Sequence, residues 1–161
     1  MRFVEGGIRN MLPSLQNEMD GTMDEKITEE LLAELLSAPS IEAFLDENDA
    51  DEVSLSAYLQ KLLDEKDLKR AEVIRMANLN ATFGYQIFTG ARGAGRDTIL
   101  QLAFAMQLTL RETNRLLQAA GVNGLYCKSR RDGIIIFCIE HSHSLQRTNE
   151  ELYRFGESTI C

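Results

Sequence analysis

The sequence predicts an all-α protein, and three observations lead to that class. Leucine and isoleucine recur three and four residues apart along much of the chain, which is the spacing of one face of a helix. A segment near the middle has the pattern of two short helices joined by a tight turn. The last part of the chain repeats the part before it at an offset of 35 positions, and we expect both copies to be helical hairpins.

Length and composition set the size of the protein and its compartment. A chain of 161 residues that is 44% hydrophobic can form one sizeable core, or a compact domain with an appended arm. No apolar run approaches the roughly 18 residues that span a bilayer, and the N-terminus lacks a signal-peptide pattern. Cys127, Cys138 and Cys161 make an odd number without a close pair. We therefore expect a cytoplasmic protein with reduced thiols and no membrane partner.

The charge is divided unevenly along the chain. The overall net charge is −8, which by itself argues against a polyanionic partner. Residues 1–54 hold 14 acidic and 3 basic residues, net −11, whereas residues 55–161 hold 11 acidic and 14 basic residues, net +3. The sequence therefore predicts an acidic N-terminal extension at 1–54, a mildly basic domain at 55–121, and a C-terminal hairpin at 122–161 packed on that domain.

The acidic extension is predicted to hold two short helices. Residues 1–21 show little periodicity and are expected to be loosely attached. A leucine stripe predicts an amphipathic helix at 28–37, which Pro39 ends, and Ser40 can cap a second short helix. The charge run at 46–52 is expected to be a linker. Three roles stay open: a solvated appendage, a partner-binding arm, or an arm that folds over the basic surface and inhibits it.

The domain itself is predicted to begin with a helix at 55–65, capped by Ser54 or Ser56. A short helix at 69–77 follows. Asn78 is expected to form the turn after it, because asparagine tolerates the left-handed backbone of a tight corner. Asn80 can cap the next helix, predicted at 81–88, and Gly90 can end it.

The remainder is predicted to be two similar hairpins. Asp97 can cap a strongly apolar helix that runs through Met106, and a second helix ends at Gly121. The run GIIIFCIE would by itself suggest a buried strand, but the repeat predicts a helix there. At the 35-residue offset the matched pairs include Asp97 and Asp132, Ile99 and Ile134, Leu102 and Phe137, Thr113 and Thr148, Asn114 and Asn149, Leu117 and Leu152, and Gly121 and Gly156. The Thr-Asn pairs are expected to serve the first turn of each second helix. The last hairpin either extends the core or forms a homodimer interface.

Residues 69–96 resemble the Cro/repressor-like helix-turn-helix family, the lambda-repressor-like DNA-binding domains of phage and bacterial regulators. The resemblance covers roughly residues 55–120 and lies in the Asn78 corner, Ile87, the TGAR run from Thr89 to Arg92, and the apolar helices around them. Two positions depart from the family pattern. Ile74 stands where the first helix usually has a small residue, and Gly84 stands where the second usually has a branched aliphatic residue.

The resemblance implies sequence-specific binding of double-stranded DNA by a transcriptional regulator, with a lambda-repressor-like fold and a homodimer on a two-fold operator. It places base reading on Ala81, Thr82, Tyr85 and Gln86. Gln can pair bidentately with adenine, and the Ala and Thr methyl groups suit a thymine methyl. It places phosphate contacts on Lys69, Arg70, Thr89, Arg92 and Arg96.

Other functions have weaker support in the sequence. The alternative to DNA binding is a protein-interaction adaptor that retains the scaffold without the nucleic acid. His141 and His143, near Cys138 and Cys127, match no zinc spacing, so a capping or partly buried histidine is favoured over a metal site. The run GARGAG at 90–95 lies between helices, which is the wrong context for a phosphate-binding loop, and no catalytic triad spacing is present. We expect no enzyme activity, cofactor or metal.

Overall fold

The computed structural model of the chain describes residues 28–48 and 53–161, and every regular element in these residues is an α-helix. The chain divides into two units, residues 1–50 and 51–161, which are described separately. The predicted loose segment at 1–21 lies outside the described residues. None of the described helices combines the length and the apolar character needed to span a bilayer.

The first unit contains α3 (Thr28–Ser37) and α4 (Ile41–Asn48), on either side of Pro39. Ser40 caps α4 as predicted, because its Oγ accepts a hydrogen bond from the Ala43 amide at 3.1 Å. The linker prediction was wrong at its start, since the charge run begins inside α4. Within this unit the apolar side chains of both helices are largely exposed; they are Leu31, Leu32, Leu35, Leu36, Ile41 and Leu45.

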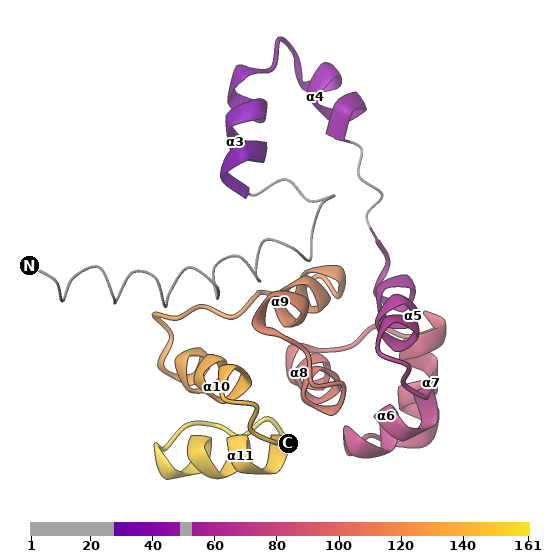
Figure 1. Cartoon of the computed structure of the whole chain (residues 1–161), viewed down its shortest axis with the longest axis vertical. Coiled ribbons are helices and arrows are strands. Elements are labelled where there is room, and N and C mark those ends of the chain that lie inside the picture. The colour runs from indigo at the N-terminus through magenta and orange to yellow at the C-terminus, as the bar shows by residue number, and fades with distance from the viewer. Residues whose placement is uncertain (1–27, 49–52) are drawn as a thin grey trace, which may run out of the picture. The chain divides into compact units, whose positions relative to one another are not determined.

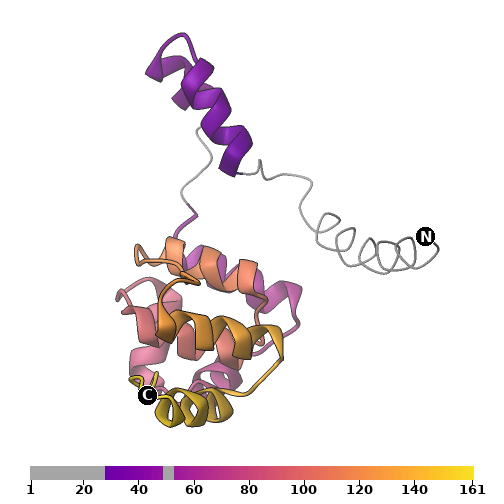
Figure 2. The same ribbon diagram turned by 90° about the vertical axis from the view of Figure 1, so that its left-hand side faces the viewer.

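The second unit consists of a group of three helices followed by two helical hairpins (Figures 1 and 2). Its helices are α5 (Leu55–Glu65), α6 (Arg70–Met76), α7 (Ala81–Thr89), α8 (Arg96–Ala105), α9 (Leu110–Ala119), α10 (Arg130–Glu140) and α11 (Leu145–Arg154). Helix α7 packs on α5 and α6, and the α8–α9 hairpin lies between this group and the α10–α11 hairpin. GIIIFCIE is therefore helical, as the repeat predicts.

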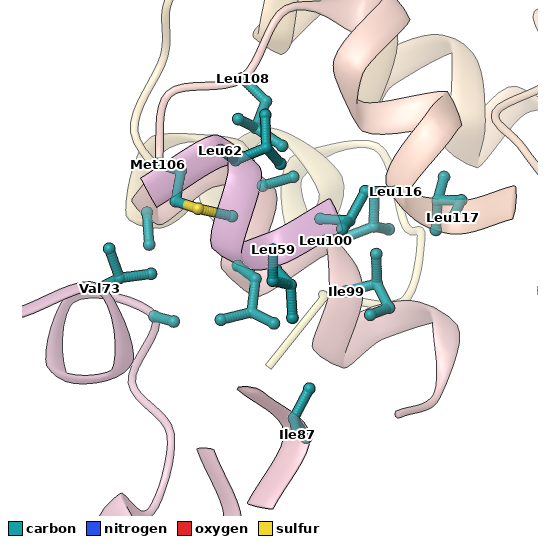
Figure 3. Packing of buried hydrophobic residues seen from close by; sticks show 14 of the residues in the cluster. Leu59, Leu62, Val73, Ile87, Ile99, Leu100, Met106, Leu108, Leu116 and Leu117 are labelled. Atoms are coloured by element: carbon teal, nitrogen blue, oxygen red, sulfur yellow. The ribbon is translucent and has the colours of Figure 1, made fainter. Parts of the chain in front are cut away.

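The core runs through the junction between the group of α5, α6 and α7 and the α8–α9 hairpin (Figure 3). Leu59 and Leu62 of α5, Val73 of α6, and Ile99 and Leu100 of α8 are almost fully buried there. Helix α8 is buried nearly all round because it packs against α6, α9 and α11. Gln101 is the polar exception, and its Nε2 donates a 3.0 Å hydrogen bond to the Ala77 carbonyl at the end of α6.

The α8–α9 and α10–α11 hairpins repeat each other in hydrogen bonding as well as in sequence. The turn within each hairpin contains a residue with positive φ, Gln107 at 53° and Ser142 at 54°. Within the second helix of each, the side-chain oxygens of Asn114 and Asn149 accept hydrogen bonds at 2.7 and 2.8 Å from the amides of Leu125 and Ile160, which lie after that helix. The asparagines thus hold the segments that follow, and the prediction that they serve the first helical turn was wrong. The threonines beside them do bond within that turn.

Two arginine–aspartate pairs connect these hairpins reciprocally. Arg96 holds both carboxylate oxygens of Asp132 at 3.0 and 2.7 Å, and Arg131 reaches Asp97 at 2.9 Å. Each arginine also donates to two backbone carbonyls at equivalent positions, Arg96 to Asn123 and Gly124, and Arg131 to Ser158 and Thr159. The predicted capping role of Asp97 was wrong, since Gly95 occupies the N-cap of α8 and Asp97 pairs with Arg131 instead. The two hairpins are therefore joined with approximate two-fold symmetry.

Tyr58 of α5 gives the unit a predictable response to alkaline pH. Burial raises the pKa of its hydroxyl from 10.0 to about 12, and the Glu112 and Glu65 carboxylates add to that rise. Because the folded state keeps the phenolic proton to a higher pH, this stabilisation is complete below the unfolded-state pKa of roughly 10 and is lost between about pH 10 and 12.

We therefore expect the free energy of unfolding to fall over that pH range, and Tyr58→Phe to remove part of the fall. Urea denaturation at a series of alkaline pH values measures this effect. Tyr85→Phe is the matched control, because the Tyr85 side chain is 55% exposed. Equal pH slopes for the two variants would show that Tyr58 is not the responsible group.

Candidate nucleic-acid interface

The corner between α6 and α7 has the backbone geometry that the sequence predicts. Asn78 adopts the left-handed conformation with φ 58°, which lets the chain reverse within four residues. The side chain of Asn80 then caps α7, because its Oδ1 accepts from the amides of Thr82 and Phe83 at 3.0 and 3.2 Å. Gly90, at φ 79°, ends the helix. Both ends of α7 are thus fixed by local hydrogen bonds and turn residues.

One face of α7 is open to solvent along its whole length. Gly84, Ile87 and Phe88 are buried against the rest of the unit. The open face consists of Ala81, Thr82, Tyr85 and Thr89, which are exposed, and Gln86, which is half-buried. The side chains expected to read bases therefore share one accessible strip, and none of them is packed in the core.

Two arginines flank this strip on opposite edges. The Arg70 guanidinium lies over the rings of Tyr85 and Phe88 at 5.4 and 5.7 Å, and the Arg92 guanidinium lies over Phe83 at 5.3 Å. Phe83 and Tyr85 are two residues apart on α7, so their side chains leave the helix roughly 200° apart. The small polar side chains of the strip consequently lie between two positive charges.

Neither flanking arginine forms an ion pair with the part of the chain that the structure describes. Arg70 instead donates from Nη2 to the Gln60 Oε1 at 3.3 Å, and Gln60 in turn donates to Asp64 at 3.0 Å. A neutral amide thus orients the Arg70 guanidinium without neutralising it. Arg92 is placed through its backbone, since its amide donates to the Gln86 carbonyl at 3.2 Å beyond the end of α7. Both charges remain available to an anionic partner.

Two sequence departures from the family pattern meet each other in space. A Cβ built on Gly84 would lie 2.6 Å from Cγ2 of Ile74, closer than real atoms approach. The branched side chain on α6 therefore occupies the volume that a larger residue on α7 would otherwise fill. The exchange keeps the two helices close, and the Gly84 position faces away from the open strip.

Comparison with protein-family models, curated proteins and solved structures finds no match to this chain.

The remaining predicted phosphate contacts divide into two groups. Lys69 and Thr89 are exposed, at the start of α6 and the end of α7. Arg96 is different, because each of its three guanidinium nitrogens donates within the protein, to Asp132 and to the Asn123 and Gly124 carbonyls. Arg96 therefore joins hairpins, and we leave it out of the candidate interface.

Gln60 and Gln101 support the site, and the sequence reasoning missed both. Gln60 orients Arg70 from a neighbouring helix, and Gln101 fixes the end of α6 to α8 through a buried bond. Gln101 could have been recognised in the sequence, because it is the one polar amide side chain inside the apolar run of α8. Gln60 carried none, since an exposed glutamine on an amphipathic helix is ordinary.

The cysteine and histidine residues do not gather into a metal site in the described part of the chain, where no group of three or more metal-ligating side chains is found. Cys138 is fully buried in α10, and burial raises the pKa of its thiol. His141 stacks on Phe137 with ring centroids 3.9 Å apart, and His143 is half-buried beside them. The side chains of Phe137, His141 and His143 thus form an aromatic cluster at the end of α10.

Proposed function

We propose that the protein binds double-stranded DNA sequence-specifically and regulates transcription, with α6 and α7 acting as a helix-turn-helix of the lambda-repressor-like type. The observation that supports this function best is the open strip of α7, flanked on both edges by Arg70 and Arg92. A helix with small polar residues on its accessible face fits the major groove, and flanking cations fit the phosphates on either side.

Base reading in this proposal rests on α7. The Gln86 amide would pair with adenine, and the methyl groups of Ala81 and Thr82 would contact thymine. Tyr85 would hydrogen-bond a phosphate through its hydroxyl or stack on an exposed base. Lys69 and Thr89 would add phosphate contacts at the two edges. The net charge of +3 on residues 55–161 would favour this association, although the whole chain is acidic.

The decisive experiment is selection of bound sites from random duplexes with the full chain, followed by titration of the selected duplex at several salt concentrations. We expect Arg70→Ala and Arg92→Ala each to weaken binding and to reduce the slope of log K against log salt by about one. Gln86→Ala should cost about 1–3 kcal/mol and relax base preference at one position of the site.

Arg154→Ala is the control for the loss of an exposed arginine. Arg154 lies on α11 with a side chain that is 68% exposed, and its partner is Glu151 on the same helix. Its removal should leave both affinity and salt slope unchanged. No enrichment of sequences in the selection, or equal effects of all three arginine variants, would contradict sequence-specific binding by α7.

One observation favours a second function, that of a protein-interaction adaptor. Tyr85 is a large exposed side chain at the edge of an open groove between α5, α6 and α7. The groove walls include the largely apolar residues Leu63, Leu68, Ala71 and Ile74. An adaptor would bind a protein partner there. Any residual association with duplex DNA would then be unchanged by the Arg70→Ala and Arg92→Ala substitutions.

A further inference from the structure

The groove between α5, α6 and α7 has a volume of about 570 Å³, and we call it the Arg70 groove. Its floor is apolar, because Leu63 of α5 and Ile74 of α6 line it with side chains that are almost fully buried. Leu68, between these two helices, and Ala71 extend the apolar lining toward solvent. The volume lies in the range of about 300–1,000 Å³ that is usual for small-molecule sites, which are also lined mainly by apolar side chains.

The polar side of the Arg70 groove carries a positive charge that no carboxylate pairs with in the described residues. The Arg70 guanidinium donates to the neutral Gln60 amide at 3.3 Å, and that amide is held in turn by Asp64 at 3.0 Å. The guanidinium also lies 5.4 Å from the centre of the Tyr85 ring. Its position is therefore fixed from two sides while its charge stays unneutralised, which prepares it to bind an anion.

The surface around the groove favours a small ligand over a protein partner. Tyr85 and Met76 are the large apolar side chains exposed on α6 and α7, and the neighbouring Lys69, Glu72 and Arg75 are exposed and charged. The apolar lining is thus confined to a few side chains inside the groove. A protein interface usually takes about 20–30 residues from each side.

We propose that the Arg70 groove binds a small carboxylate with a flat apolar body. The carboxylate accepts two parallel N–H bonds from Arg70, a geometry that the planar guanidinium favours. The apolar body covers Leu68 and Ala71 and reaches the floor of the groove. The Tyr85 ring lines the same groove, which favours an aromatic body over an aliphatic chain.

A ligand in the Arg70 groove also excludes DNA from α7, and this step rests on the proposed function. Arg70, Ala81 and Tyr85 line the groove, and all three are expected DNA contacts. The bound carboxylate neutralises one of the two charges that flank the open strip, and its apolar body covers part of the strip itself. The carboxylate and the duplex therefore compete for the same surface.

Titration of the full chain with trans-cinnamate, followed by nitrogen–proton NMR correlation spectra, tests the site. The amides of groove residues such as Leu68 and Ala71 should shift, with a Kd of about 1 mM for a ligand of this size. Arg70→Gln should weaken cinnamate binding by about 10-fold or more, because a charge-assisted hydrogen bond is lost. The neutral trans-cinnamamide should bind the original chain more weakly and be unaffected by Arg70→Gln.

Arg75→Gln is the matched control variant, because Arg75 is an exposed arginine on the same helix that does not line the groove. It should leave cinnamate binding unchanged, and circular dichroism should show equal helix content in both variants. Unchanged spectra at ten times the expected Kd overturn the inference. Shifts that avoid the groove, equal affinities for cinnamate and cinnamamide, or equal losses in the two variants overturn it as well.

Competition with the selected duplex separates this inference from the proposed function. With cinnamate at ten times its Kd, the Kd for DNA should rise by about 10-fold, whereas sodium acetate at the same ionic strength should leave it unchanged. Undisplaced duplex at that concentration overturns the exclusion of DNA. A chain that binds cinnamate through Arg70 but binds no duplex contradicts the proposed function alone. A chain that binds the duplex but not cinnamate contradicts the groove inference alone.

Discussion

Gly84→Val is expected to destabilise the protein by about 2 kcal/mol or more, because the added side chain enters space that Ile74 already fills. The nearest approach of a new Cβ would be 2.6 Å to Cγ2 and 2.9 Å to Cγ1 of that isoleucine. These atoms lie close to the stiff branch point of a buried side chain, so they cannot rotate away cheaply. Urea denaturation followed by circular dichroism measures the loss.

Ile74→Ala alone is also expected to destabilise the protein, by about 2–4 kcal/mol, because it leaves a cavity beside Gly84. The variant that combines Gly84→Val with Ile74→Ala exchanges the two side-chain volumes. Its loss of stability should be smaller than the sum of the two single losses by about 2 kcal/mol or more. Gly93→Val serves as the control, since a Cβ at Gly93 meets no atom within 4 Å. Additive single effects would show that the two residues are not in contact.

Asp132→Ala is expected to cost about 3 kcal/mol of stability, because it leaves the Arg96 guanidinium without its counter-charge. The Asp132 side chain is 9% exposed, and it accepts from Arg96 and from the Tyr126 amide at 3.0 Å. Removing it also leaves that amide without its acceptor in a partly buried loop, which adds to the cost. The free energy of unfolding from urea titration is the measurement.

The repeat supplies a matched control for this substitution in Asp97→Ala. Asp97 occupies the equivalent position, but its side chain is 48% exposed and receives one bond from Arg131. Arg131 keeps the Ser158 and Thr159 carbonyls when the carboxylate is lost. The cost should therefore stay below about 1 kcal/mol. Similar losses for the two aspartates would contradict the conclusion that burial sets the value of each pair.

The local features of the fold were predictable because each has a short-range cause. Asn78 and Gly90 adopt left-handed backbone, and Asn80 accepts its capping bonds from the amides of Thr82 and Phe83. The helix at 130–140 was predictable in spite of its β-branched residues, because the repeat constrains it to match α8. Errors arose where a side chain has both local and distant partners available. Asp97 could have capped α8, but it pairs with an arginine 34 positions away.

The candidate interface shows the same division between local and distant causes. The open strip of α7 followed from its helical period, since Phe83 and Ile87 share a face and leave Thr82 and Gln86 outside. The sequence did not predict that Arg92 and Arg96 have different roles, because both lie in one short glycine-rich stretch. Only the packing of the α10–α11 hairpin places Asp132 beside Arg96, whereas Arg92 faces solvent.

The sequence by itself determined the positions of the described helices, their turns and the 35-residue repeat, because periodicity, capping and left-handed turn residues act within a few positions of the chain. The tertiary structure alone decided which cations are engaged internally and which face solvent. Those outcomes depend on contacts between residues far apart in sequence, such as Arg96 with Asp132 and Gln101 with Ala77. Such pairings leave no local pattern, so only the stacking of the hairpins reveals them.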